Sequence, residues 1–291
     1  MKNLKIIGST LAACCLLLIA CNKEQDFIEK VEADVSQSTE LAYIESVSTD
    51  VEETVDESLI APPPPDDPAS TTDCPVRTLE NDPGVFPNTL TLDYGDGCEG
   101  PGGKVRSGKI IIVFTDSLHK DGAMRTVSFE EFYVDGVQIM GTKTWENQGI
   151  DDAGTITIHK TASLEFSFPD ETSATFNTDH TIVKSVEFLR YRDGGKWKTR
   201  IKRFLGMVEV TGSSSGVNRA GNTFEAVIVD PLVKPHDCFW FASGVIELTI
   251  NDEMRSIDYG DGACNNAAVV TLPDGTTREI NIKPFWVPKR K

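Results

Sequence analysis

Hydrophobic residues follow two different spacing patterns along this chain, and the change from one pattern to the other marks a boundary between two regions. From about residue 75 onward, short apolar runs alternate with polar turns. Lys109–Phe114 is a continuous, mostly apolar run with β-branched residues, and residues 164–168 alternate apolar and polar with a period of two. Asp135-Gly136 and Asp274-Gly275 separate such runs and predict hairpin turns. This pattern predicts an all-β domain at residues 73–291, an antiparallel meander forming a sandwich or an open roll.

A second spacing pattern is found in residues 21–72, the predicted stalk. Apolar residues mostly at spacings of three and four would form one helical stripe, namely Phe27, Val31, Val35, Ile44, Val47, Val51, Val55 and Leu59. The other face is acidic and rich in Ser and Thr, which weaken a helix. Two interpretations stay open: an amphipathic helix that docks on the domain or a partner, and a disordered, solvated spacer. Pro62–Pro65 begin a stiff linker and predict a domain boundary near residue 70.

The formal charge of −17 is concentrated in this stalk, because residues 22–72 carry fourteen acidic residues against two lysines. A chain this acidic lacks the clustered Lys and Arg that nucleic-acid binding requires, so we expect no nucleic-acid partner. The exception is a basic segment near residues 184–203. There, Lys196, Lys198, Arg200 and Lys202 alternate along one predicted strand. They are candidates for binding an anionic glycan, a lipid head group or the acidic stalk; the alternative is a solvated outer face.

The first twenty residues read as a secretory signal. Lys2 and Lys5 precede an apolar stretch that ends in Leu18-Ile19-Ala20-Cys21. This ending resembles the bacterial lipobox, in which the Cys becomes the lipidated first residue of the mature protein. The resemblance implies that Cys21 anchors the protein to a membrane through acyl chains. We expect an outer-membrane location, with the domain displayed on the cell surface.

The most specific signal is an internal echo. The run Asp93-Tyr94-Gly95-Asp96-Gly97-Cys98 returns as Asp258 to Cys264, and an Asp-Cys pair precedes each copy, at Cys74 and at Cys238. An exported protein oxidises its cysteines. Three pairings are open, and the echo favours Cys74–Cys98 and Cys238–Cys264.

The acidic residues of the two echoed loops are candidates for calcium, a cation that prefers oxygen ligands; they are Asp93, Asp96, Asp258 and Asp261. Their spacing differs from that of a calcium-binding loop, so we favour a structural role in which Asp and Gly shape the turn. No catalytic residue or cofactor follows from the sequence. The spelling Gly-x-Ser-x-Gly around Ser214 lacks the helix that a nucleophile elbow needs.

The echoed motif, with Arg106-Ser107-Gly108 and the later Pro231-Leu232-Val233, resembles a group of secreted Bacteroidetes lipoproteins that have no assigned activity. The resemblance covers most of residues 73–283 and implies an anchored β-protein. Our leading hypothesis is a non-enzymatic binding or structural module of the cell envelope. The alternatives are a lipid or lipopolysaccharide carrier, which needs an apolar hollow, and a glycan-acting enzyme, which needs two facing carboxylates.

Overall fold

The computed structural model describes residues 7–60, 74–99, 103–118 and 120–282. Its elements are listed here in chain order: α1 Ile7–Ile60, β1 Val76–Leu79, β2 Asn88–Asp93, β3 Cys98–Glu99, β4 Val105–Phe114, β5 Met124–Val134, β6 Val137–Ile150, β7 Thr155–Ser167, β8 Ser173–Asp193, β9 Lys196–Val217, β10 Thr223–Pro235, β11 Ser243–Ile250, β12 Glu253–Asp261, β13 Ala267–Thr271 and β14 Thr277–Asn281.

The strands form one antiparallel meander, as the alternating pattern predicted. All fourteen belong to a single sheet in which β1, β2 and β4 to β14 follow one another in chain order, while the short β3 pairs beside β4. The sheet is open and does not close on itself. The predicted turn at Asp135-Gly136 joins β5 and β6, where Val134 pairs with Val137. The all-β class is therefore confirmed, in the form of one long curled sheet.

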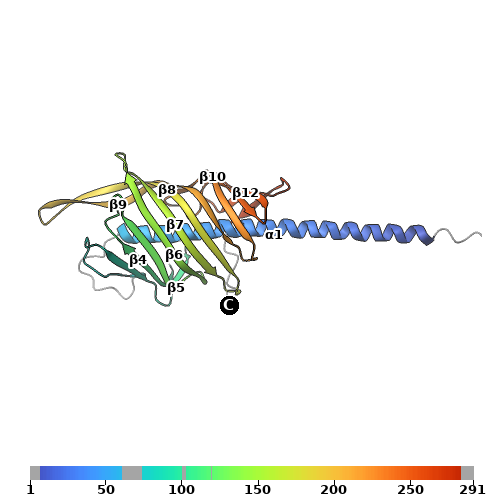
Figure 1. Cartoon of the computed structure of the whole chain (residues 1–291), viewed down its shortest axis with the longest axis horizontal. Helices are drawn as coiled ribbons and strands as arrows, with labels where there is room; N and C mark the ends of the chain where they lie inside the picture. Colours follow the sequence, from blue (N-terminus) through green and yellow to red (C-terminus); the bar gives the residue numbers. More distant parts are fainter. Residues whose placement is uncertain (1–6, 61–73, 100–102, 119, 283–291) are drawn as a thin grey trace, which may run out of the picture.

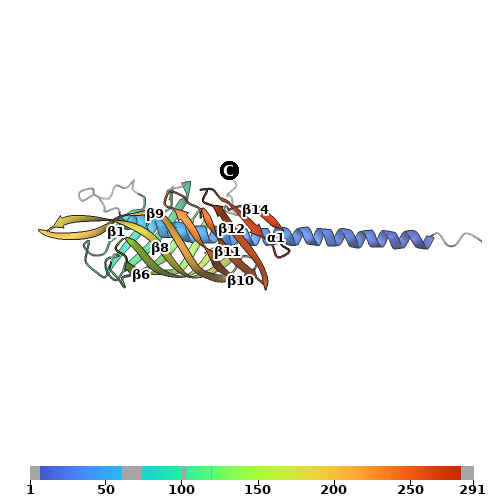
Figure 2. The ribbon, with the colours of Figure 1, turned by 90° about the horizontal axis from the view of Figure 1, so that it is seen from above.

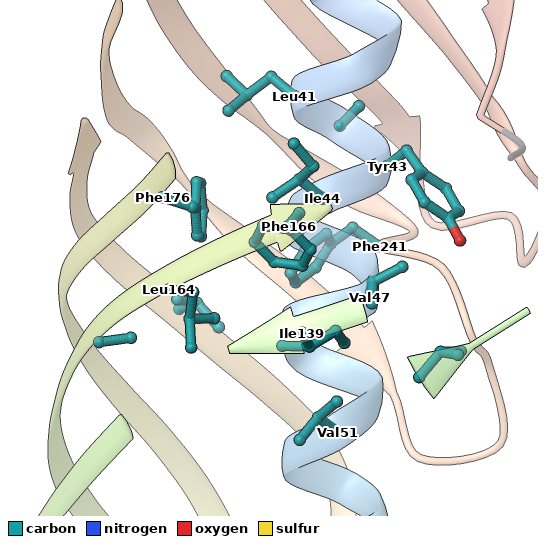
Figure 3. Packing of buried hydrophobic residues seen from close by; sticks show 14 of the residues in the cluster. Leu41, Tyr43, Ile44, Val47, Val51, Ile139, Leu164, Phe166, Phe176 and Phe241 are labelled. Atoms are coloured by element: carbon teal, nitrogen blue, oxygen red, sulfur yellow. The ribbon is translucent and has the colours of Figure 1, made fainter. Parts of the chain in front are cut away.

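The curled sheet wraps around the second half of α1. Figures 1 and 2 show the helix running lengthwise through the hollow of the sheet, with its first half projecting from one end. Every residue from position 40 to position 52 is buried, on all sides of the helix. Ile44, Val47 and Val51 pack among side chains of the sheet such as Phe166 and Phe241, as seen in Figure 3. The helix is thus the centre of the hydrophobic core.

Short hydroxyl side chains make this burial possible. Ser38, Ser46 and Thr49 each donate a hydrogen bond to the backbone carbonyl four residues earlier, at 2.9 to 3.0 Å. A buried hydroxyl that bonds within its own helix needs no partner on the sheet. The Ser and Thr residues that weakened the helix prediction therefore give a slim helix, and the hydroxyl groups of these three are satisfied within it.

Glycines in the sheet allow it to curl. Gly108 on β4 and Gly244 on β11 have φ angles of +79° and +110°, and the strand register shifts at both places. A side chain at either position would collide with the neighbouring backbone, since a Cβ would lie 1.9 Å from the Glu131 carbonyl oxygen or 2.4 Å from that of Pro231. Such kinks bend a sheet that would otherwise stay flatter.

The two echoed units are structurally equivalent and lie in the first and last parts of the sheet. In the first, Asp93 pairs with Lys109, the residue that follows Gly108; in the second, Asp258 pairs with Val245, the residue that follows Gly244. The disulfides are Cys74–Cys98 and Cys238–Cys264, the pairing that the echo favoured. Each one fastens a unit that carries a buried tyrosine.

The stalk differs from its expected form in one respect. In the predicted apolar stripe, Ile44, Val47, Val51 and Val55 are buried and Val31 and Val35 are partly buried, so of the two open interpretations the docked helix is the one observed. Acids of the other face from Asp34 to Asp56, such as Glu45 and Asp50, are buried as well, because the sheet surrounds this part of the helix instead of touching one side of it. The linker at residues 61–73 and residues 1–6 of the predicted signal lie outside the described residues. In the described part of the chain, no helix is long and apolar enough to cross a membrane.

The helix provides a direct test of this fold. We expect backbone amides of residues 40–52 to exchange with deuterium as slowly as those of the central strands, because exposing them requires the sheet to open. Amides of residues 22–33 on the same helix serve as the internal control and exchange faster. Mass spectrometry of peptic fragments measures both. Equal, fast exchange in the two segments would contradict the enclosed helix.

Candidate functional site

The inner face of the sheet carries buried cations. They come from strands or strand ends spread across the sheet and are Arg106, Arg125, Lys143, Lys160, Lys184, Lys234 and Arg255, all at most 4% exposed. On a strand, alternate residues face the same side, and these cations share the inward positions with apolar core residues. Lys143, for example, follows Ile139 and precedes Trp145 in the inward series of β6. Buried cations of this number need matching negative charge.

Helix α1 supplies that charge. Asp50 accepts a hydrogen bond from Arg106 on β4 at 2.5 Å, and Asp56 accepts from both Arg125 on β5 and Lys184 on β8. Farther toward the N-terminus, Asp34 accepts from Arg255 on β12. The acidic residues thus bind strands that are distant from one another in the sheet. The ion pairs fix both the depth and the rotation of the helix.

Two glutamates in this interior behave in opposite ways. Burial raises the pKa of the Glu45 carboxyl, and the opposing effect of Lys160 and Lys143 is too small to reverse it. Burial would also raise the pKa of Glu52, but Lys160, Lys184, Lys143 and Arg125 outweigh it and lower the pKa to about 2. Glu52 is therefore ionised at neutral pH, with the Lys160 side-chain nitrogen at 3.6 Å, whereas burial disfavours the charged form of Glu45.

His180 faces Glu45 at 3.7 Å, yet the two do not form an ion pair. Burial, together with Lys160, lowers the pKa of His180 to about 2, so its imidazole is neutral. Neither carboxyl oxygen of Glu45 nor either ring nitrogen of His180 has a hydrogen-bond partner among the described residues. This part of the interior is polar but poorly satisfied, in contrast to the well-paired contacts of Asp50 and Asp56.

A separate depression of about 690 Å³ lies where β8 to β11 meet the loops at one end of the sheet. It is lined mainly by hydroxyl, amide and carboxyl groups: Thr175, Asn177, Ser215, Thr223, Glu225, Thr249, Asn251 and Asp252. Such groups can form hydrogen bonds with a polar ligand. Glu225 and Asp252 are both exposed to solvent, a setting that does not favour a general acid, which enzymes usually create by burying a carboxyl group.

The predicted calcium candidates serve the turns. Asp93 accepts a hydrogen bond from the Gly95 amide and Asp258 from the Gly260 amide, each at 2.8 Å. Asp96 and Asp261 are exposed. Among the described residues, no group of three or more His, Cys, Asp or Glu side chains could hold a metal ion.

The anion-binding candidates lie on a protruding part of β9. Lys196 is exposed beside the turn Gly194-Gly195, and Lys198, Arg200 and Lys202 follow it along the strand, with side chains outside the described set. Lys196, the one whose side chain is described, is not among the buried cations that receive the helix. Cys21 lies within α1, and its side chain is likewise outside the described set.

The sequence interpretation missed the buried cations because a single lysine within a strand resembles a surface residue. The alternation along the strand could have revealed them. Lys160 lies an even number of residues from Ile156, Ile158 and Leu164 on β7, so it belongs to the same, inward-facing side of the strand.

Comparisons with known proteins give no family for this chain. No family model matches it, and neither a curated protein nor a solved structure resembles it significantly.

The contrast between Glu45 and Glu52 predicts opposite effects of the same substitution. Glu52→Gln removes a negative charge that four buried cations share, and we expect it to destabilise the protein by roughly 3–5 kcal/mol. Glu45→Gln removes a carboxyl whose charged form is disfavoured by burial, so we expect stability at pH 7 to be equal or higher. Because the folded-state pKa of Glu45 is raised, the wild type should lose stability relative to Glu45→Gln as the pH rises above 4.5. Urea unfolding at several pH values measures both; equal losses at pH 7 would refute this assignment.

Lys143 gives a pH effect of the opposite sign. Burial, with help from Lys160, lowers its pKa from 10.5 to about 7. Between these values the unfolded chain binds the proton that the folded protein has released, so stability from this group rises with pH. We expect wild type to gain stability relative to Lys143→Met between pH 7 and pH 10. Exposed Lys120→Met is the control and should show no such gain; parallel pH curves for wild type and Lys143→Met would contradict the prediction.

Proposed function

We propose that this protein is a lipid-anchored module of the cell envelope that binds or organises other molecules without catalysing a reaction. The lipobox-like sequence ending at Cys21 supports the anchor. The same helix that contains Cys21 continues into the core of the sheet, so anchor and body belong to one rigid element. From Cys21 to Asp34, at the entrance of the sheet, the helix would extend about 20 Å at 1.5 Å per residue.

The observation that carries this proposal is the occupied interior. A carrier of lipid or lipopolysaccharide needs an apolar hollow for acyl chains, and in a curled sheet that hollow would be the inner face. Here the inner face surrounds α1 and is charged, with cations such as Arg106 and Lys184 committed to acids of the helix. Opening this space would leave several buried charges unpaired, at a cost of several kcal/mol for each.

The outer surface supports a binding role over an enzymatic one. The described depression offers hydroxyl and amide groups, and its two carboxylates are exposed. This setting is suited to hydrogen bonding with a ligand more than to proton transfer. The outer-membrane location, and the likeness to secreted Bacteroidetes lipoproteins, remain part of the proposal.

The anchor can be tested by lipid labelling. We expect the full-length chain, produced in a bacterial host with an outer membrane, to incorporate radioactive palmitate and to sediment with the outer membrane. Cys21→Ser should abolish both. The control Cys14→Ser/Cys15→Ser changes cysteines that lie inside the predicted signal and should keep both. An unmodified Cys21 in envelope preparations of the wild type would overturn the anchor.

The carrier alternative has its own test. Organic extraction and mass spectrometry of the purified protein should yield no stoichiometric phospholipid or lipopolysaccharide beyond the acyl groups on Cys21. One co-purified lipid per chain would favour the carrier.

A further inference from the structure

The longest hairpin of the sheet extends beyond its neighbours. Pairing between β7 and β8 ends at Ser185, and pairing between β9 and β10 begins at Met207. Residues 186–206 are called the basic arm here, and within it residues 186–204 pair only with each other in the described register. Figures 1 and 2 show this arm protruding from the end of the sheet opposite to the projecting half of α1.

The charge of the basic arm is opposite to that of the rest of the chain. It contains seven Lys or Arg residues and two acidic residues, in a protein with a net charge of −17. Elsewhere in the sheet, buried cations such as Arg106, Arg125 and Lys184 pair with acids of α1. The described cations of the arm, Arg190, Arg192 and Lys196, are exposed.

Edge protection alone does not account for this composition. Charged residues on unpaired strand edges prevent aggregation, and a few lysines suffice for that purpose. The arm also contains Phe188, Tyr191, Trp197 and Phe204, and Tyr191 is 36% exposed. A segment that contains both cations and aromatic residues can attract a negatively charged sugar and also contact its apolar ring face. This composition favours binding of a charged sugar over a purely solubilising role.

The arrangement of the cations fits an extended ligand. Lys196, Lys198 and Arg200 occupy alternate positions of one strand, and alternate residues are about 7 Å apart. The register places Lys198 opposite Tyr191 and Arg200 opposite Leu189. A row of evenly spaced charges gives a polymer several simultaneous contacts, whereas a single small anion would use one.

The position of the arm decides between the two anionic ligands considered so far. If Cys21 holds the protein at a membrane, as proposed above, the arm is at the far end of the molecule, beyond the whole sheet. It would face away from the lipid head groups of the anchoring membrane. We propose that the basic arm binds an anionic polysaccharide, and this inference rests on the proposed anchored module for its orientation.

The test uses the purified full-length protein in detergent. Polygalacturonate and dextran sulfate are the anionic probes, neutral dextran is the uncharged control, and vesicles containing phosphatidylglycerol represent a membrane. We expect wild type to bind both anionic polymers at physiological salt, more weakly as salt rises, and not to bind dextran. Lys196→Glu/Lys198→Glu/Arg200→Glu should weaken binding by about tenfold or more, since the contacts act together.

A matched variant separates the arm from general electrostatics. Lys109→Glu/Lys120→Glu/Arg278→Glu makes the same change in net charge at three positions outside the arm, of which Lys109 lies on β4. We expect its affinity to stay within about threefold of wild type. Arg190→Glu/Arg192→Glu, on the other strand of the arm, should repeat the loss if the first triple variant fails to fold, as judged by circular dichroism.

Three outcomes would overturn the inference: no binding of wild type to either anionic polymer, equal losses in the arm and control variants, or arm-dependent binding to vesicles that is tighter than binding to the polymers. None of these measurements involves acylation of Cys21, so failure of the arm and failure of the anchor are distinguishable.

Discussion

The structure depends on burying an acidic helix inside a cationic sheet. Charges are costly to remove from water, and those of Arg106, Arg125 and Lys184 are tolerable here because a carboxylate of α1 lies next to each of them. Asp56 illustrates the constraint, since it serves Arg125 and Lys184 together and links β5 to β8 through the helix. A helix that is rotated or shifted by one turn would leave these groups unpaired. The ion pairs therefore select one arrangement, while the apolar contacts of Ile44, Val47 and Val51 supply cohesion.

Much of the fold could be predicted from local patterns. The alternation in residues 164–168, the Asp-Gly turn at position 135 and the helical stripe from Ile44 to Val55 each depend on near neighbours and were visible in the sequence. The relation between helix and sheet was not, because Asp50 finds its partner 56 residues away at Arg106 and Asp56 finds Lys184 at a separation of 128. Nothing in the local pattern distinguishes an acid that faces water from one that faces a distant arginine.

The role of the echoed motif could be predicted only in part. Its acidic residues suggested a cation site, and its glycines and cysteines suggested a turn; the structure uses Asp93 and Asp258 to hold the turn through the glycine amides. Recognising that each copy also pairs with a Ser-Gly segment required the strand register, because that segment follows the first copy but precedes the second. The repeated structural unit therefore consists of the same two segments in opposite chain order. A linear comparison of the sequence does not detect a repeat of this kind.

The continuity of α1 has a mechanical consequence. In a body held through its N-terminal helix, any drag on the sheet is transmitted along the helix axis, parallel to the direction in which the helix would have to slide out. The salt bridges at Asp34, Asp50 and Asp56 are distributed over about 33 Å of that axis and would be loaded in shear at the same time. Contacts that share a load in this way resist extraction together, so the sheet would have to unfold before the tether could be pulled free.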